Sequence, residues 1–165
     1  MTEIFPKDVY SSLKTVLSNS SYLTYFDEIV IRKFRRGNLP DFEYYCIVIS
    51  PQSALAVVYP AHQRYIENTI QLVMIGKMLG TEEEAILADS PLATPPKVGI
   101  LAMYEDIVRT LYENDLGGAI EFTPGLKELD YASDFDVVVE EEREGFLMEM
   151  RMSYHPKGAR FVDLK

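Results

Sequence analysis

Three side chains are of a type that could act as a nucleophile, an acid–base group or a metal ligand: His62, His155 and Cys46. Both histidines lie near prolines, and neither has a further histidine, cysteine or carboxylate at the spacing of metal ligands. We therefore expect solvated loop histidines. The cysteine lies in an apolar run, which favours a buried and unreactive thiol. From these residues we predict no catalytic residue, no metal site, no cofactor and no enzymatic activity.

A single cysteine also excludes an intrachain disulfide and a zinc site built on several thiolates. The absence of disulfides is typical of proteins assembled in a reducing, intracellular environment. No apolar stretch is long enough to cross a bilayer, and the first residues do not resemble a secretory signal. We expect neither a membrane span nor secretion.

Carboxylates are concentrated between Glu121 and Glu149, a segment with ten acidic residues and two basic ones. Asp130, Asp134 and Asp136 resemble a calcium loop in composition, but the alternate ligand spacing followed by glycine is missing. No two carboxylates are distinguished as a general acid and a general base. The segment is therefore predicted to form a solvated acidic surface.

The one basic cluster consists of Arg32, Lys33, Arg35 and Arg36, beside Phe34. Its charge is opposite to that of the acidic segment, and complementary surfaces suit docking onto another copy or an ordered partner. A soluble strand edge and a nucleic-acid contact are the alternatives. The net charge of −10, from 26 acidic and 16 basic residues, argues against general binding to nucleic acid or to anionic membranes.

The positions of apolar residues predict one domain in these 165 residues. We expect a helix over 6–18, an antiparallel pair of strands over 28–36 and 42–50, and a further strand over 54–59. A long strand over 64–77, with Gly76 as a bend, places Tyr65, Glu67 and Gln71 on one face. These three residues join the basic cluster as candidate interface residues.

The second half of the chain begins with an irregular, proline-rich connection over 79–97 that contains a short helix near 82–88. Thr94 and Pro95 are expected to start the second principal helix, which reaches the Gly117–Gly118 pair. Strands are expected over 119–122, 136–140 and 145–154. The order of elements predicts an α+β fold with two principal helices on one face of a mainly antiparallel sheet.

This layout resembles the tail terminator proteins of long-tailed bacteriophages, also called tail completion or neck proteins. The resemblance rests on the opening helix with Asp8 and Leu13, the sheet of hairpins, the second helix from Gly99 to Asn114, and the closing strand from Gly145 to Tyr154. The 79–97 connection departs from the shorter family members and resembles an insertion. It is a candidate contact with sheath or neck proteins.

Membership of that family would imply a structural protein of the virion, assembled in the host cytoplasm. Its subunits would form a hexameric ring that caps the head-proximal end of the tail tube and ends tube polymerisation. Its partners would be other copies of itself, the tail tube protein, a head-side connector or stopper protein and the sheath protein. Genome DNA would pass through the lumen without specific binding. Another neck or completion protein of the same particle, and a cellular module that binds a protein or small ligand, are the alternatives.

Overall fold

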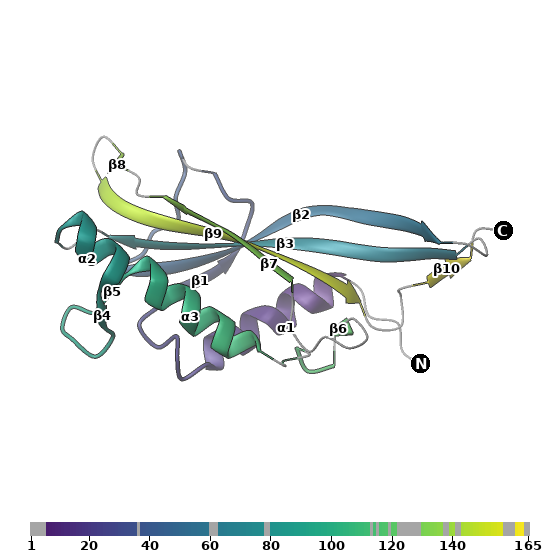
Figure 1. Cartoon of the computed structure of the whole chain (residues 1–165), viewed down its shortest axis with the longest axis horizontal. Helices are drawn as coiled ribbons and strands as arrows, with labels where there is room; N and C mark the ends of the chain where they lie inside the picture. Colours follow the sequence, from purple (N-terminus) through teal and green to yellow (C-terminus); the bar gives the residue numbers. More distant parts are fainter. Residues whose placement is uncertain are drawn as a thin grey trace.

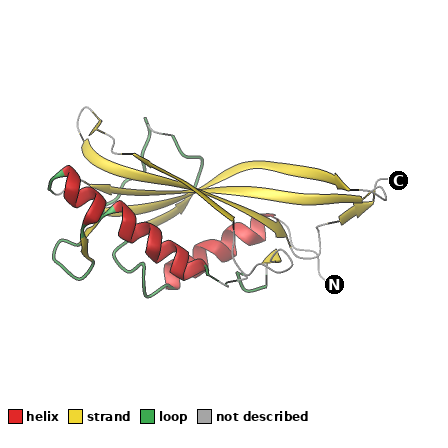
Figure 2. Ribbon diagram, viewed as in Figure 1, coloured by secondary structure: helices red, strands yellow, loops and turns green. Residues whose placement is uncertain are grey.

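A twisted, mainly antiparallel sheet carries helices on one face (Figures 1 and 2). The computed structural model describes residues 6–35, 37–59, 63–77, 80–112, 114, 116–118, 120–121, 130–136, 139–140, 143–156 and 161–163. The elements are α1 (Pro6–Asn19), β1 (Glu28–Ile31), β2 (Tyr45–Tyr59), β3 (Gln63–Lys77), α2 (Glu82–Leu87), β4 (Asp89–Ser90), β5 (Lys97–Val98), α3 (Ile100–Leu111), β6 (Ile120–Glu121), β7 (Asp130–Asp136), β8 (Val139–Glu140), β9 (Arg143–Pro156) and β10 (Phe161–Asp163). The predicted α+β class is confirmed.

The strands β2, β3 and β9 form the centre of the sheet, in the order β1-β2-β3-β9. The strands β6, β7 and β8 pair with β9, and β10 pairs with β3. Every pairing is antiparallel except that of β1 with β2. The predicted long strand, the closing strand, the opening helix and the short helix near 82–88 are all confirmed within a few residues.

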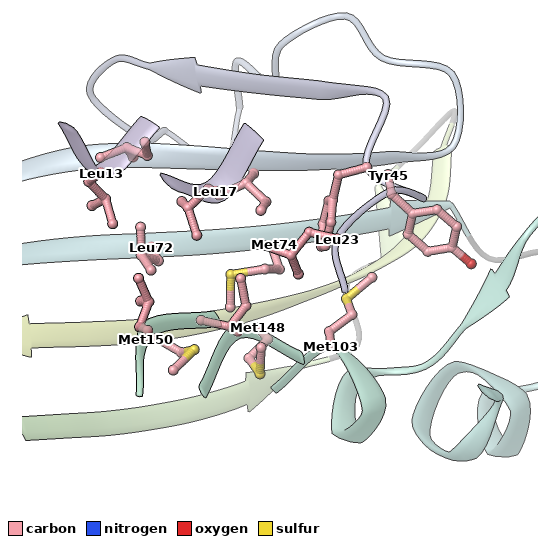
Figure 3. Packing of buried hydrophobic residues seen from close by; sticks show 14 of the residues in the cluster. Leu13, Leu17, Leu23, Tyr45, Leu72, Met74, Met103, Met148 and Met150 are labelled. Carbon is pink, nitrogen blue, oxygen red and sulfur yellow. The ribbon is translucent and has the colours of Figure 1, made fainter. Parts of the chain in front are cut away.

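The main core lies between the sheet and the helices α1 and α3 (Figure 3). In α1 the buried residues recur at helical spacing, as in Leu13 and Leu17, and alternate residues of the strands meet them. Each fully buried side chain of this size contributes about 1.5–3 kcal/mol relative to exposure. Methionines fill much of the space between α3 and the sheet: Met74, Met103, Met148 and Met150.

The opposite face of the sheet is covered by the chain between β1 and β2. A second buried cluster there contains Cys46, Val48, Val73, Ile75 and Leu147. The side chains that pack over this cluster come mainly from the connection: Val30, Phe34, Leu39 and Phe42. The inner parts of the central strands, at 45–49, 72–75 and 146–148, are therefore buried on both faces, which explains why these segments are apolar at every position.

The first two strands are parallel, so the predicted antiparallel pair over 28–36 and 42–50 is wrong. Glu28 lies opposite Cys46, and Ile31 lies opposite Ile49. The strand β1 ends at Ile31, and residues 32–44 return the chain to the level at which β1 began. A parallel pair needs such a crossover of about a dozen residues or more. The basic cluster consequently lies in this crossover, outside any strand.

A carboxylate fixes this parallel register. Asp27 accepts hydrogen bonds from the backbone N–H groups of Glu43, Tyr44 and Tyr45, at 2.7, 2.8 and 3.0 Å. Its own N–H donates to the carbonyl of Tyr45 at 3.1 Å. These bonds hold the start of β2 beside the start of β1, so the crossover can close only in the parallel sense.

The predicted separate strand over 54–59 is the outer half of β2. Pro51 does not interrupt the strand, although the register with β3 shifts between Pro51 and Ala54. The pairing with β1 ends at Ile49, so within the described chain this part of β2 is an edge. A proline is tolerated at an edge because its missing N–H removes no bond between strands.

Gly76 is not a bend, because it keeps regular register with both Tyr45 and Phe146. A Cβ atom at this position would overlap the ring of Phe146, which lies directly over the glycine. The residue therefore provides space for an aromatic ring of the core.

Two boundaries in the second half differ from the prediction. The helix α3 begins at Ile100 with Gly99 as its N-cap, five residues after Pro95. The preceding residues instead pair with β4 as strand β5. The helix ends at Leu111, and Leu116, Gly117 and Gly118 follow with positive φ angles. Val98 is extended because it pairs with Asp89, so the helix cannot include it.

The predicted strand over 136–140 falls on the end of β7 and on β8, since Asp136, Val139 and Glu140 all lie in strands. The strand that pairs with the middle of β9 is the more polar β7, while Val139 and Glu140 form the short β8. Val137 and Val138 lie outside the described residues. An edge strand accepts polar residues, so β propensity alone did not identify it. The predicted strand over 119–122 is present as the shorter β6.

Replacement of Gly76 by alanine is expected to lower the free energy of unfolding by about 1–3 kcal/mol, because the new methyl group displaces the Phe146 ring. Urea denaturation measures this loss. Gly37→Ala is the matched control, because a Cβ there meets no atom within 4 Å. Equal stability of the two variants would contradict the close packing at Gly76.

Asp27→Ala is expected to lower the free energy of unfolding by about 1–3 kcal/mol, because three backbone N–H groups lose a charged acceptor. The exposed Asp41 of the same crossover provides the control variant, Asp41→Ala. Hydrogen exchange of the amides of Tyr44 and Tyr45 should accelerate in the Asp27 variant alone. Unchanged exchange would mean that the carboxylate does not hold the start of β2.

Candidate functional site

The predicted basic cluster forms an exposed surface on the crossover. The guanidinium of Arg32 donates to the carbonyl of Asn38, and Lys33 Nζ lies 3.5 Å from the carbonyl oxygen of Pro51. Arg35 is exposed, and Arg36 lies outside the described residues. Below them the N–H of Phe34 donates to Ser50 Oγ at 3.0 Å, and the ring packs on the second cluster. We call Arg32, Lys33 and Arg35 the basic crossover.

The candidate residues of β3 do not all lie near this surface. Gln71 is half-buried and stands in register with Ser50, the residue that receives the Phe34 hydrogen bond. Tyr65 and Glu67 lie in the outer half of β3, with Tyr65 about 20 Å from Gln71 along the strand. Their side chains are not among those described. The structure therefore brings Gln71 close to the basic crossover and separates the other two from it.

Two of the three potentially reactive residues, Cys46 and His155, lie in the described part of the chain. Cys46 is fully buried, and burial raises the pKa of its thiol to about 12, which opposes the reactive thiolate form. His155 lies in β9 opposite Glu121, not in a loop, because pairing with β6 extends the strand. His62 lies outside the described residues.

No three His, Cys, Asp or Glu side chains come together at metal-binding distance in the described part of the chain. Among the same residues, no helix combines the length and the apolar character needed to cross a bilayer.

A small pocket lies between α2, β5 and the sheet. Its volume of about 250 Å³ includes its open mouth, whereas small-molecule sites usually occupy ~300–1,000 Å³. Lys97 pairs with Glu84 at 3.4 Å, and Lys77 Nζ donates to the Phe42 carbonyl at 2.8 Å. The hydroxyl of Tyr45 donates to the carbonyl of Pro96 and accepts from the N–H of Val98. These polar groups already join the elements of the fold, so the pocket is best explained as a structural joint.

A polar pair that the sequence did not predict consists of the buried Tyr25 and the half-buried Asp106. The Tyr25 hydroxyl donates to Asp106 Oδ2 at 2.9 Å and ties the segment after α1 to α3. Burial, followed by the nearby carboxylate, raises the pKa of Tyr25. Burial also raises the pKa of Asp106, and the hydrogen bond from Tyr25 opposes this rise. The sequence did contain one signal for this pair: Asp106 is an acidic residue directly before Ile107, on the apolar side of the predicted helix.

The segment from α2 to the start of α3 exposes several large apolar side chains. The most exposed are Leu92, at 91%, and Leu87, at 61%. Four of the seven exposed large apolar residues in the described part of the chain occur here: Ile86, Leu87, Leu92 and Leu101. We call these four residues the apolar end. Three of them lie in the 79–97 connection, which the resemblance made a candidate contact with sheath or neck proteins, but the sequence pattern did not predict that these apolar side chains are exposed.

Hydrogen bonds and packing join the elements that carry the apolar end. Thr81 caps α2 by accepting the N–H of Glu84 at 3.3 Å, β4 pairs with β5, and the N–H of Gly99 donates to the Ala88 carbonyl at 2.8 Å. The helix α2 packs against α3. Exposed apolar side chains on such a fixed support are typical of interaction surfaces.

Comparison with known proteins gives no family assignment: no family model matches the chain, and no curated protein matches it. Candidate functions are therefore argued from these surfaces and from the resemblance stated above.

Tyr25→Phe is expected to lower the free energy of unfolding by about 1–3 kcal/mol at pH 7, because an ionised carboxylate loses its donor. Burial raises the pKa of Asp106 in the folded chain, so the stability linked to its protonated form is present at low pH and is lost as the pH rises. The hydrogen bond from Tyr25 favours the ionised carboxylate instead, so the loss caused by Tyr25→Phe should be smaller at pH 4 than at pH 7, because a larger fraction of Asp106 is protonated at pH 4.

Urea denaturation at the two pH values tests this, with Tyr112→Phe on an exposed tyrosine as the control. An equal loss at both pH values would exclude an ionised Asp106 as the partner of Tyr25.

Proposed function

We propose that this chain is a structural subunit of a bacteriophage tail. Six copies form a ring on the head-proximal end of the tail tube, stop tube polymerisation and join the tail to the head-side connector. The subunit acts by binding other proteins and performs no reaction. This proposal combines the resemblance of the sequence to tail terminator proteins with the surfaces described above.

The observation that carries the proposal is an arm of the sheet that extends beyond the helices. The outer halves of β2 and β3, with β10 beside them, continue past the end of α1 (Figure 1). Both long strands have 15 residues, and residues 54–59 of β2 are wholly apolar in sequence. In the described chain, the edge of β2 beyond Ile49 pairs with no other strand.

A long strand edge that lacks a pairing partner is a site for pairing with another chain. A subunit that must join two neighbours in a ring needs such a surface. The arm therefore supports a subunit of an assembly.

The charge of the chain supports the same proposal. A net charge of −10 repels DNA phosphates, and a ring through which a genome passes benefits from a wall that does not retain it. The pocket, in contrast, gives little support to a module that binds small ligands, because its polar groups already bond to one another and to the backbone.

Native mass spectrometry over a range of concentrations, with negative-stain imaging, tests the proposal. We expect a hexamer with an open centre. A stable dimer would contradict the ring and favour the cellular binding module. A chain that stays monomeric both alone and with tail tubes present would also contradict it.

An arm-shortened variant shows whether the arm is required. Residues 55–67 are replaced by Asn-Gly, which favours a tight turn between Ala54 and Asn68, a pair in register. The core residues of β2 and β3 lie at 45–50 and 70–75 and are untouched. We expect a folded chain, by circular dichroism, that forms no ring. A ring of normal size from this variant would exclude the arm as the contact.

A further inference from the structure

We infer that the apolar end of one subunit binds the basic crossover of the next copy, in a head-to-tail contact. This inference rests on the self-association in the proposed function and identifies a second pair of surfaces that the arm does not provide. It depends on three observations: exposed apolar residues, opposite charges and the position of the two surfaces on different layers.

The apolar end has the composition of an interface. Leu87, Leu92 and Leu101 are 61%, 91% and 42% exposed; the first lies in α2, the second in the loop between β4 and β5, and the third in the first turn of α3. Exposed charges along the same elements are mainly acidic: Glu82, Glu83, Glu84, Asp89 and Glu105 are exposed, and the exposed Lys97 pairs with Glu84. An apolar centre with charged residues around it is the usual arrangement of protein interfaces.

The basic crossover carries the complementary features. Ile31, at the end of β1, is 40% exposed and directly precedes Arg32. Lys33 and Arg35 are exposed beside it, while the exposed acidic residues Asp41 and Glu43 lie further along the crossover, toward β2. One surface therefore presents leucines with carboxylates, and the other presents an isoleucine with cations. Complementary charge favours this pairing over contact between two identical surfaces.

The two surfaces lie on opposite layers of the subunit. The crossover packs over the cluster that contains Val48 and Leu147, on one face of the sheet. The elements of the apolar end belong to the helical layer, since Ala85, Val98 and Ile100 are buried in the other cluster. A contact between different surfaces repeats from copy to copy, and it closes into a ring where the rotation permits.

Two variants, each with one surface blocked, test the contact. The first carries Lys33→Glu and Arg35→Glu, which reverse the charge of the basic crossover. The second carries Leu87→Glu and Leu92→Glu, which place charges on the apolar end. All four residues are exposed, so both variants should fold. Matched controls are Lys14→Glu on α1 and Tyr112→Glu after α3, which are exposed positions outside both surfaces.

We expect the wild type and both controls to form the ring and each blocked variant to be a monomer. An equimolar mixture of the blocked variants should give a dimer of twice the 18.9 kDa chain mass and nothing larger. In that dimer the intact apolar end of the first variant binds the intact crossover of the second, and both outer surfaces are blocked. The arms remain, but an arm contact alone does not hold a further copy if each blocked variant is a monomer by itself.

Three results would overturn the inference. A ring from either blocked variant would show that the surface is not needed, and it would leave the proposed function standing. A mixture that stays monomeric, while the wild type forms a ring, would show that these two surfaces do not bind each other. A wild type that never associates, alone or with tail tubes present, would contradict both the inference and the proposed function.

Discussion

The hydrogen bonds between Asp27 and the start of β2 are the constraint on which the rest of the structure depends. They join the beginnings of the first two strands, so the strands run parallel and residues 32–44 must cross the sheet. Tyr45, the last of the three donors, extends the constraint to the helical layer. Its hydroxyl bonds to the backbone of Pro96 and Val98, which places β5 and the start of α3.

A crossover in this position has two consequences. It buries the second face of the sheet, so that Cys46 and Val73 are as inaccessible as the residues under the helices. It also carries cationic side chains to a surface on the layer opposite the helices. A direct hairpin would have left that face of the sheet open and the same cations along a strand. The hydrogen bonds of the Asp27 carboxylate thus determine both the burial of this face of the sheet and the position of the basic crossover.

The exposed features of the described chain divide into an arm and a body. The arm offers unpaired backbone along β2, which is suited to strand addition but discriminates little between partners. The body offers two surfaces of opposite charge, which in the proposed ring supply direction and specificity. A ring subunit needs both properties, because it must bind neighbours firmly and in one orientation. The buried Tyr25–Asp106 pair contributes to this architecture by fixing α3 against the segment after α1.

The sequence by itself determined the elements whose signals lie in neighbouring residues. The spacing of Val9, Leu13 and Leu17 defined α1, and alternation of side chains defined β3 and β9, because helical and strand periods are local properties. Only the tertiary structure decided the direction of β1, the start of α3 at Ile100 and the site of the basic crossover. Each depends on hydrogen bonds between residues distant in the chain, such as those of Asp27 with Tyr45 and of Tyr45 with Val98. Such long-range bonds override local propensity and leave no periodic pattern in the sequence.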